Sequence, residues 1–491
     1  MELTVTSITA HGTFQSGEYL CLEGIFYGEL SVTEAISGLE KAPRNERGRV
    51  AYSTTVRLIV PQDPRWGNGA LLVDLPNRGL PSAHYIYNNP LNHTLPFGSL
   101  GAGNGFLEDH GFLMASVQWE LGRGINLPAF TDGLGRKRYV EGAALVVIRD
   151  FLDWLRFSSD LLPGLAAPLS QGITRVLGVG WSQTGRLLKT LLLHGFNLTR
   201  HGLLIDGIHH QAGPTGWLPL LQSGSGPDSS AVSVPTPDHP DMRGVVEEPL
   251  TPAALLKVMA ERGESAPRMI FTVMSLDYYI LRASLFRTGA KGCCDLPIPE
   301  SVRVYDVAGG AHALVPTAGC AYPRGTLDWG PVMRAVLLHL DRWVKEGVPP
   351  PPNRLMPLAA RPRDPAVLQT PAHLPEAVVQ VPKVDSDGNP LGGIRLPDIE
   401  VPLGTHGAPN APASDFGCFI SGSFVPFCET EAERSAQNDT RRSRQARYPN
   451  PDVYLERVRA AAEQLVQEGF LLEEDRRLVL DTARQEAKKP C

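Results

Sequence analysis

The chain has 491 residues, of which 42% are hydrophobic and 20% are charged, and its formal net charge is −6 at pH 7. This composition is typical of a globular enzyme, and the acidic balance argues against nucleic acid as a partner. No run of about 18 apolar residues occurs, so we expect no membrane span. Residues 1–7 also lack the basic and apolar regions of a secretory signal.

The cysteines indicate reduced thiols and no disulfide framework. Their number is odd and no Cys-x-x-Cys pair occurs, which argues against both a disulfide scaffold and a zinc site. We therefore expect a cytoplasmic protein that uses no metal and no cofactor. The sequence indicates no oligomeric state. The cysteines are Cys21, Cys293, Cys294, Cys320, Cys418, Cys428 and Cys491.

The first 65 residues have the pattern of an antiparallel β-region. Polar and apolar residues alternate with a period of two, and Gly, Pro and Asn lie between the runs. The alternating runs are "LTVTSITAHGTF", "LCLEGIFYGEL" and "VAYSTTVRLIVP". We expect these strands to lead into a larger sheet.

Residues 66–348 alternate strands with helices. Short apolar runs predict buried strands, whereas apolar residues at helical spacing predict the helices that cover them. Strands are expected at 69–76, 112–120, 174–180, 201–208, 268–275 and 301–309, and helices at 143–157, 184–195 and 330–347. Buried parallel strands with helices on both faces make this region an α/β domain.

Two further regions interrupt or follow this domain. Residues 213–250 are rich in Gly, Pro and Ser, and such a long irregular excursion predicts a lid. Residues 349–491 begin with a proline-rich segment that has short strand-like runs, and they end in helices packed on the domain. Asn450 as N-cap and Gly469 after the last turn delimit the first helix, and a second is expected over 473–486.

The turn "GWSQTG" at 180–185 places a serine between a predicted strand and a predicted helix. It lacks the third glycine of a dinucleotide-binding turn and the lysine of a phosphate-binding loop. It fits a nucleophile elbow, Gly-x-Ser-x-Gly, in which small residues flank a sharp bend. Thr184 stands where the second glycine is usual, and Gly185 follows it. Ser182 is therefore the candidate nucleophile.

A serine nucleophile needs a base, and the base needs a carboxylate to orient it. In this architecture the chain order is serine, acid, histidine. Asp277 follows the strand at 268–275, and His312 lies in a glycine-rich loop after the strand at 301–309. Asp206, at the end of another predicted strand, is the alternative acid.

The tetrahedral intermediate needs preorganised hydrogen-bond donors. We expect one from the backbone N–H of Gln183, at the start of the helix, and a second from the turn that contains Asn77 and Arg78. The pocket is expected to use Trp181, His209, His210 and Trp217. Core packing is an equal alternative for the tryptophans and turn capping for the histidines. No third metal ligand and no His-Glu-x-x-His motif accompany these histidines.

Much of the chain resembles bacterial alpha/beta hydrolase domain-containing proteins. The resemblance is carried by "NRG" (77–79), "GWSQTGR" (180–186), "GFN" (195–197), "DG" (206–207), "SLDYYILRASL" (275–285), "YDVAGGAHA" (305–313), "RWVKEGVPPPP" (342–352), "FVPFCETEAER" (424–434) and "RYPNPDVYLERVRAAAEQLVQEGFLLEED" (447–475). It implies an alpha/beta-hydrolase fold in which the β-region and the helical tail belong to one unit. It also favours Asp277 over Asp206, although similar proteins more often carry glutamate at this position.

The expected function is hydrolysis of a carboxylic ester through an acyl-enzyme, with a triad of Ser182, His312 and Asp277. The same residues would also serve a lactonase, an amidase or an acyltransferase. A non-catalytic protein that binds a ligand on the same scaffold is a further alternative. The resemblance implies a small ester or lactone as the substrate and names no compound.

Overall fold

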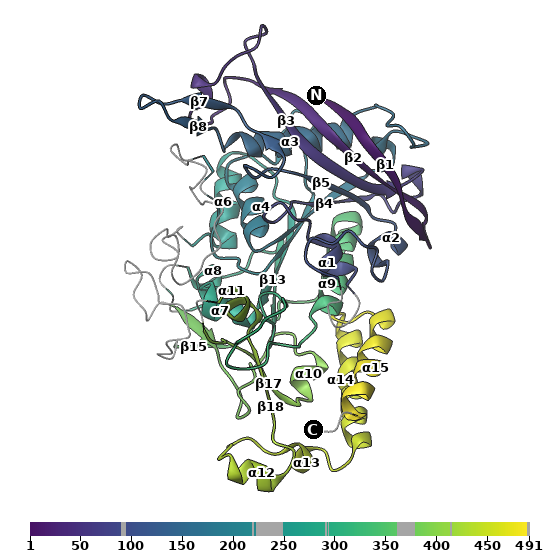
Figure 1. Ribbon diagram of the computed structural model, residues 1–491, viewed down its shortest axis with the longest axis vertical. Coiled ribbons are helices and arrows are strands. Elements are labelled where there is room, and N and C mark those ends of the chain that lie inside the picture. Colours follow the sequence, from purple (N-terminus) through teal and green to yellow (C-terminus); the bar gives the residue numbers. More distant parts are fainter. Residues whose placement is uncertain are drawn as a thin grey trace.

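A large sheet forms the centre of the molecule (Figure 1). The computed structural model describes residues 1–89, 95–218, 220–221, 249–289, 292, 294–360, 379–412 and 415–488. The sheet has 10 strands in the order β1-β2-β3-β5-β4-β9-β12-β13-β14, and β6 is added beside β3. The smaller elements around it are η1 (Leu39–Lys41), η2 (Pro64–Trp66), α1 (Ala83–Tyr87), α2 (Phe106–Asp109), β6 (Ile125–Asn126), β7 (Ala129–Thr131), β8 (Lys137–Tyr139), η3 (Leu169–Gln171), α7 (Ser275–Ile280) and α8 (Ser284–Thr288).

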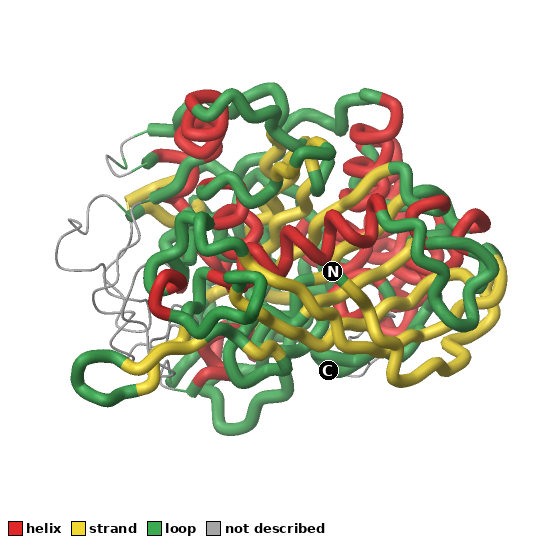
Figure 2. Tube along the Cα trace, turned by 90° about the horizontal axis from the view of Figure 1, so that it is seen from above, coloured by secondary structure: helices red, strands yellow, loops and turns green. Residues whose placement is uncertain are grey.

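The N-terminal part of the sheet is antiparallel, as its alternating sequence predicts. β1 (Glu2–Phe14) pairs with β2 (Gly17–Leu30), which pairs with β3 (Val50–Pro61). Alternate residues of β2 and β3 are buried because one face of these strands packs inward, with α3 (Ala143–Phe157) against β2. Figure 2 shows these long strands in yellow.

The six strands from β5 to β14 along the sheet are parallel to one another and almost fully buried. Antiparallel pairing of β3 with β5 joins the two parts, so one hydrophobic core cluster runs through both. All residues of β4, β9 and β12 are buried, as expected for strands covered on both faces. The strands are β5 (Leu113–Val117), β4 (Ala70–Asp74), β9 (Arg175–Trp181), β12 (Gly207–Gln211), β13 (Arg268–Met274) and β14 (Val302–Val307).

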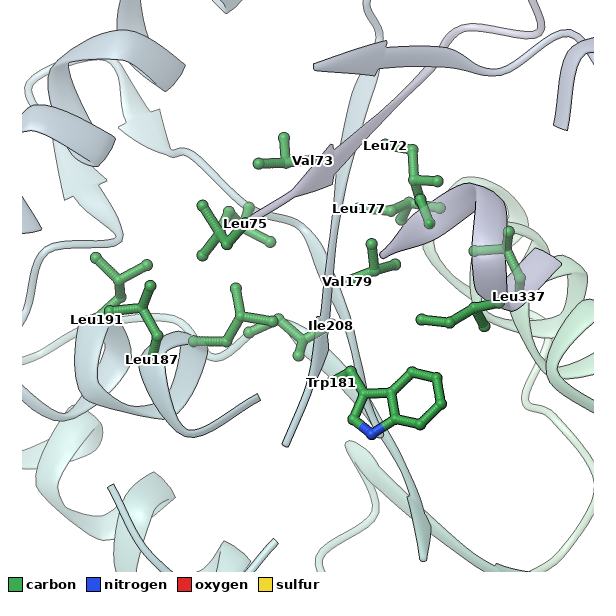
Figure 3. Packing of buried hydrophobic residues seen from close by; sticks show 14 of the residues in the cluster. Leu72, Val73, Leu75, Leu177, Val179, Trp181, Leu187, Leu191, Ile208 and Leu337 are labelled. Carbon is green, nitrogen blue, oxygen red and sulfur yellow. The ribbon is translucent and has the colours of Figure 1, made fainter. Parts of the chain in front are cut away.

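Helices pack against β9 from opposite sides of the sheet. α4 (Gln183–Leu193) contacts β9 and β12, and α9 (Gly330–Glu346) contacts β9, β12 and β13 from the other face. Figure 3 shows Leu187 and Leu191 of α4 on one side of β9 and Leu337 of α9 on the other. Each such side chain, fully buried, contributes about 1.5–3 kcal/mol to the free energy of folding. The central strands are therefore a rigid support for the loops at their ends.

The predicted strand at 201–208 is wrong. A short hairpin occupies the first part of this range, and β12 begins only at Gly207. The Asn197 side chain closes the intervening loop, because it donates to the carbonyl of Ile205 at 3.0 Å and accepts from its N–H at 2.9 Å. The loop is apolar because it is buried, and this made it look like a strand. The hairpin consists of β10 (Leu198–Thr199) and β11 (Gly202–Leu203).

Most of the predicted lid at 213–250 lies outside the described residues. The residues not described there are 219 and 222–248. Leu218 and Leu220, before this stretch, are buried. After it, Thr251 caps α6 (Pro252–Glu261) by accepting a hydrogen bond from the N–H of Ala254 at 3.2 Å. The lid therefore remains a prediction.

The C-terminal region begins with short strands and helices and ends in two longer helices. These elements are β15 (Leu358–Ala360), β16 (Gln380–Pro382), α10 (Pro397–Glu400), β17 (Gly404–Ala408), α11 (Phe416–Ser421), β18 (Ser423–Pro426), α12 (Glu431–Ala436), α13 (Arg444–Arg447), α14 (Pro451–Glu468) and α15 (Glu473–Lys488). Asn450 caps α14 by accepting from the N–H of Val453, and Gly469 ends the helix with φ 82°. A buried ion pair between Arg334 and Asp475, at 2.7 Å, joins α15 to α9.

The interpretation of all cysteines as reduced thiols is wrong at two positions. Cys320 and Cys418 form a disulfide, with their Cα atoms 5.7 Å apart although 98 positions separate them in the sequence. Their spacing resembles no local motif, so the pairing could not be predicted from the sequence. Among the described residues, Cys21 and Cys428 are free. Within the described part of the chain, every helix is too short or too polar to cross a membrane.

Candidate active site

Ser182 lies at the bend between β9 and α4, at the carboxyl edge of the parallel strands. Its φ of 53° and ψ of −108° form a conformation that a residue with a side chain rarely adopts. The backbone N–H of Ser182 donates to the carbonyl of Gln211 at 2.8 Å, which ties the bend to the end of β12. Such a strained strand-to-helix bend exposes a hydroxyl in front of a helix N-terminus.

Two glycines allow α4 to approach the sheet closely at this bend. A Cβ at Gly180 would lie 2.6 Å from the backbone of Thr184, and one at Gly185 would lie 2.7 Å from the imidazole of His210. Thr184 has room for its side chain, and its hydroxyl accepts from the N–H of Trp181 at 3.0 Å. The crowded positions are therefore 180 and 185, which explains why threonine is tolerated between them.

Asp277 and His312 are in direct contact behind this bend. Asp277 lies on α7 directly after β13, and His312 lies in the loop after β14. The Nδ1 atom of His312 is 2.7 Å from Oδ1 of Asp277. The other carboxylate oxygen accepts from the backbone N–H groups of Gly213 at 3.1 Å and Met274 at 3.2 Å. Asp277 is fully buried, so the imidazole is held in one orientation by a fixed carboxylate.

A cavity of about 220 Å³ opens beside Ser182, and His312 is in its wall. The remaining lining residues are Asn77, Arg78, Leu80, Phe97, Trp181, Gln183, Arg186, Ile280, Leu281, Ala313, Val315, Phe416, Phe419 and Ile420. Among the described residues, Ser182 and His312 line this cavity without a direct hydrogen bond to each other. The hydrogen bond between a nucleophile and its base is often long or absent in a free enzyme and forms fully only when substrate is bound.

The turn after β4 reaches the same cavity. Arg78 and Gly79 both have positive φ, 53° and 79°, so the backbone turns back sharply there. The Asn77 side chain donates to the carbonyl of Trp181 at 2.8 Å, and the N–H of Arg78 donates to Oε1 of Gln183 at 3.1 Å. The structure thus brings together all three residues that the sequence proposed for the oxyanion site.

The cavity wall is mostly apolar but includes two cationic side chains. Arg78 and Arg186 both line it. Burial lowers the pKa of Arg78 to about 10, partly offset by the nearby Glu120 carboxylate. At neutral pH Arg78 is therefore still protonated. The described lining residues include one histidine and no carboxylate or thiol, so this cavity lacks the ligand set of a zinc ion.

Asp206 lies far from this arrangement in the sheet. It immediately precedes β12, at the amino edge of the parallel strands, whereas Ser182 follows β9 at the carboxyl edge. Its carboxylate pairs with Arg156 at 2.9 Å and accepts from the N–H of Val176 at 2.8 Å. The later start of β12 is the reason that Asp206 does not reach the edge expected from the sequence.

Three of the proposed pocket residues lie elsewhere. His209 and His210 are fully buried within β12. His209 contacts the hydroxyl of Tyr87 at 2.8 Å, and burial lowers its pKa to about 3, so it is neutral. Trp217 packs against His194, with ring centroids 5.7 Å apart. None of the three is among the described lining residues, whereas Trp181 is.

Sequence reasoning missed the wall that α11 contributes. Phe416, Phe419 and Ile420 lie in this short helix, and Ile420 accepts a hydrogen bond from the N–H of Ala313, next to His312, at 3.1 Å. The only signal was the apolar run in "FGCFI", which is too short to indicate a helix or a site.

Comparison with known proteins gives a family match and distant structural likenesses. No curated protein matches the sequence. A fluorophosphonate-binding serine hydrolase F from Staphylococcus aureus is 10% identical over 58% of this chain and 90% of its own, with a TM-score of 0.28. An S-formylglutathione hydrolase from the same species is 9% identical over 51% and 77%, with a TM-score of 0.25.

An alpha-amino acid ester hydrolase is 12% identical over 38% of this chain, with a TM-score of 0.20, and this chain spans 25% of its length. The family assignment does not depend on these likenesses. The model of a family described as alpha/beta hydrolase domain matches residues 124–481, which is more than half of the chain. The sheet, its covering helices and this match agree, and the chain belongs to the alpha/beta hydrolase domain family.

Proposed function

We propose that the protein is a serine hydrolase that cleaves a small carboxylic ester, with Ser182, His312 and Asp277 as its triad. The observation that carries this proposal is the 2.7 Å contact between His312 and Asp277 beside the cavity that Ser182 also lines. A buried carboxylate that orients an imidazole next to a strained serine is the arrangement that activates a hydroxyl.

In this mechanism Ser182 Oγ attacks the ester carbonyl, and His312 Nε2 takes the hydroxyl proton. His312 then returns the proton to the leaving alcohol, and a water molecule releases the acyl group by the reverse sequence. Asp277 stabilises the imidazolium and fixes the tautomer in which Nδ1 carries a proton. The attraction between the Asp277 carboxylate and the His312 imidazolium is stronger in a site from which water is excluded than in bulk water.

The negative charge of the tetrahedral intermediate develops on the former carbonyl oxygen of the ester. The N–H of Gln183, the first residue of α4, is the proposed main donor, because the N-terminus of a helix favours negative charge. The Asn77–Arg78 turn is the proposed second side of this site. The N–H of Arg78 donates to the Gln183 side chain in the free protein. It would have to break this hydrogen bond before it could donate to the oxyanion of the substrate.

The size of the cavity limits the acyl group. A volume of about 220 Å³ is smaller than the roughly 300–1,000 Å³ typical of sites for drug-sized ligands. We therefore propose short-chain esters as substrates. p-Nitrophenyl acetate and butyrate should be hydrolysed with a higher kcat/KM than the decanoate, and lactones and amides in the same screen would show whether the ester is preferred.

The first prediction concerns Ser182 itself. S182A should reduce hydrolysis of p-nitrophenyl butyrate to background and abolish labelling by a fluorophosphonate probe, because the variant lacks the only hydroxyl that the proposed mechanism makes reactive. The measurement is initial rate together with intact-protein mass after labelling. S435A, at an exposed serine of α12, is the matched control and should label like the wild type. Undiminished turnover by S182A would contradict the proposal.

A further inference from the structure

Two histidines and a glutamate converge on one point beneath the N-terminal strands. His11 lies on β1, His84 on α1 and Glu108 on α2. Nε2 of His11 is 2.8 Å and Nε2 of His84 is 3.0 Å from the same oxygen, Oε1 of Glu108. The three potential ligand atoms all lie within 4.8 Å of one another. The active-site mechanism proposed above uses none of these residues.

The side chains of the cluster are almost completely buried. The Glu108 side chain is 0% exposed, and those of His11 and His84 are 8% and 4% exposed. A carboxylate at this depth needs hydrogen-bond donors or a positive charge beside it.

A further residue fixes the carboxylate from behind. The side chain of Asn88 donates to Oε2 of Glu108 at 2.6 Å and to the carbonyl of Ala102 at 3.0 Å. Its own oxygen accepts from the N–H of Leu107 at 2.9 Å. The carboxylate is therefore held so that Oε1 alone faces the two imidazoles. Outer hydrogen bonds of this kind orient the ligands of metal sites.

We propose that His11, His84 and Glu108 form a binding site for a divalent transition-metal ion, with zinc as the expected occupant. Two imidazole nitrogens and one carboxylate oxygen are a ligand set typical of zinc, whereas calcium and magnesium prefer oxygen ligands alone. Zinc–ligand bonds of about 2.0–2.2 Å place tetrahedral ligands about 3.3 Å apart, so the two N–O distances would need to widen by only a few tenths of an ångström. Water would take the fourth position.

Binding requires a change of proton positions. A ligating Nε2 must be free of its proton, so zinc would replace the two contacts that these nitrogens make with Glu108, and the single proton of each neutral ring would have to lie on Nδ1. Zinc binding should therefore weaken as the pH falls, because protons compete with the metal for the ligating nitrogens. The expectation that the protein uses no metal rested on cysteine spacing and on local motifs, and neither can detect ligands at positions 11, 84 and 108.

The position of the site gives the ion a structural role. β1 belongs to the N-terminal antiparallel strands, whereas α1 follows the Asn77–Gly79 turn that reaches the active-site cavity. An ion here would join these two parts of the chain. His11, His84 and Glu108 are not among the described residues that line the cavity, so the ion would stabilise the fold without contacting substrate.

The test uses the full chain, purified without reductant so that the disulfide stays formed, with free thiols blocked by iodoacetamide. The disulfide must stay formed because Cys320 and Cys418, if reduced, could bind zinc together with the nearby Asp415. The protein is stripped with dipicolinate, dialysed and titrated with ZnCl₂ by calorimetry. Co²⁺ is then used as a spectroscopic probe. The variants are H84Q and H11Q, and H201Q is the matched control because His201 contacts Asp153 at the surface.

Wild type and H201Q should bind about one equivalent of zinc, gain several degrees in Tm and show the intense visible bands of tetrahedral Co²⁺. H84Q and H11Q should bind at least about 100-fold more weakly and lose those bands and the gain in Tm. H11Q keeps the test valid if H84Q fails to fold, since His11 is on an outer strand. The proposal would be overturned if the wild-type protein bound no zinc, or if H84Q and H11Q bound zinc as tightly as the wild type. Esterase activity is not needed for either readout.

Discussion

The two oxygens of Asp277 have separate tasks. One contacts His312, and the other accepts two backbone N–H groups, from Gly213 and Met274. This division fixes the carboxylate plane, and through it the imidazole plane, without any contact to substrate. A glutamate has a longer side chain, so it would make the same contact with His312 only if the backbone of α7 lay farther from the imidazole. The position of α7 therefore suits aspartate.

D277N tests this assignment. Asparagine keeps the shape but removes the charge and allows the amide group to favour the wrong imidazole tautomer. We expect kcat for p-nitrophenyl butyrate to fall by about 10⁴-fold. Circular dichroism should show an unchanged fold. D206N is the control, and its kcat should stay within about twofold because Asp206 pairs with Arg156 at the other edge of the sheet. The reverse order of effects would assign the acid to Asp206.

The sequence could predict Ser182, Asp277 and His312 as candidates because each follows a strand and their order along the chain is diagnostic. It could not predict the α11 wall, since Phe419 and Ile420 reach the cavity from far along the chain. His209 and His210 were placed at the pocket because β12 was expected to end near residue 208. The actual strand starts at Gly207, so both side chains lie inside the sheet.

At the scale of elements, a buried ion pair helps to join α15 to the core. Arg334 is 1% exposed and Asp475 2% exposed, and Arg334 also donates to the carbonyls of Tyr87 and Asn89. One guanidinium thus connects α9, the end of α1 and the C-terminal helix. The apolar stripe of α14 could be predicted from its spacing, whereas this polar link could not.

D475N should be strongly destabilising. It leaves the Arg334 charge buried without its counter-charge, and breaking such a pair typically costs about 3–5 kcal/mol. Urea unfolding at pH 7 measures the loss. D481N is the control on the same helix, because Asp481 forms only exposed pairs with Arg477 and Arg484, and its effect should stay within about 0.5 kcal/mol. An equal loss of unfolding free energy in the two variants would show that the buried pair stabilises the fold no more than an exposed pair does.

Long periodic elements were predicted closely, and short ones were not. The helix expected at 143–157 is α3 with the same bounds, and the helix expected at 330–347 is α9. α1, α2 and α11 have only four to six residues each, too few to show a 3.6-residue period. Their positions depend on side-chain capping and tertiary contacts, such as Asp74 accepting from the N–H of Ser82 before α1.

At the scale of the whole molecule, the Cys320–Cys418 disulfide fastens the segment after His312 to α11. The loop it closes spans 98 positions, so it removes much conformational freedom from the unfolded chain. No sequence rule could pair these residues, because the pairing depends on where two distant segments meet in space. The disulfide also restrains the wall of the cavity that sequence reasoning missed.

The double variant C320S/C418S should unfold more easily, by about 4.7 kcal/mol according to the loop-closure estimate for a loop of this length. Differential scanning calorimetry without reductant measures the shift in Tm. Dithiothreitol should lower the Tm of the wild type and leave that of the double variant unchanged. C428S, at a free cysteine, is the control and should respond to dithiothreitol as the wild type does. Wild-type protein indifferent to reductant would contradict this expectation.

The place of β4 in the sheet has a practical consequence. The family match begins at residue 124, but β4 lies between β5 and β9 and provides the turn that borders the cavity. A recombinant fragment restricted to 124–481 would leave one side of β9 with unsatisfied backbone groups and an uncovered apolar flank. Such an open strand invites intermolecular pairing. Expression trials guided by the family boundaries alone should therefore give aggregates, and gene design should retain the first 123 codons.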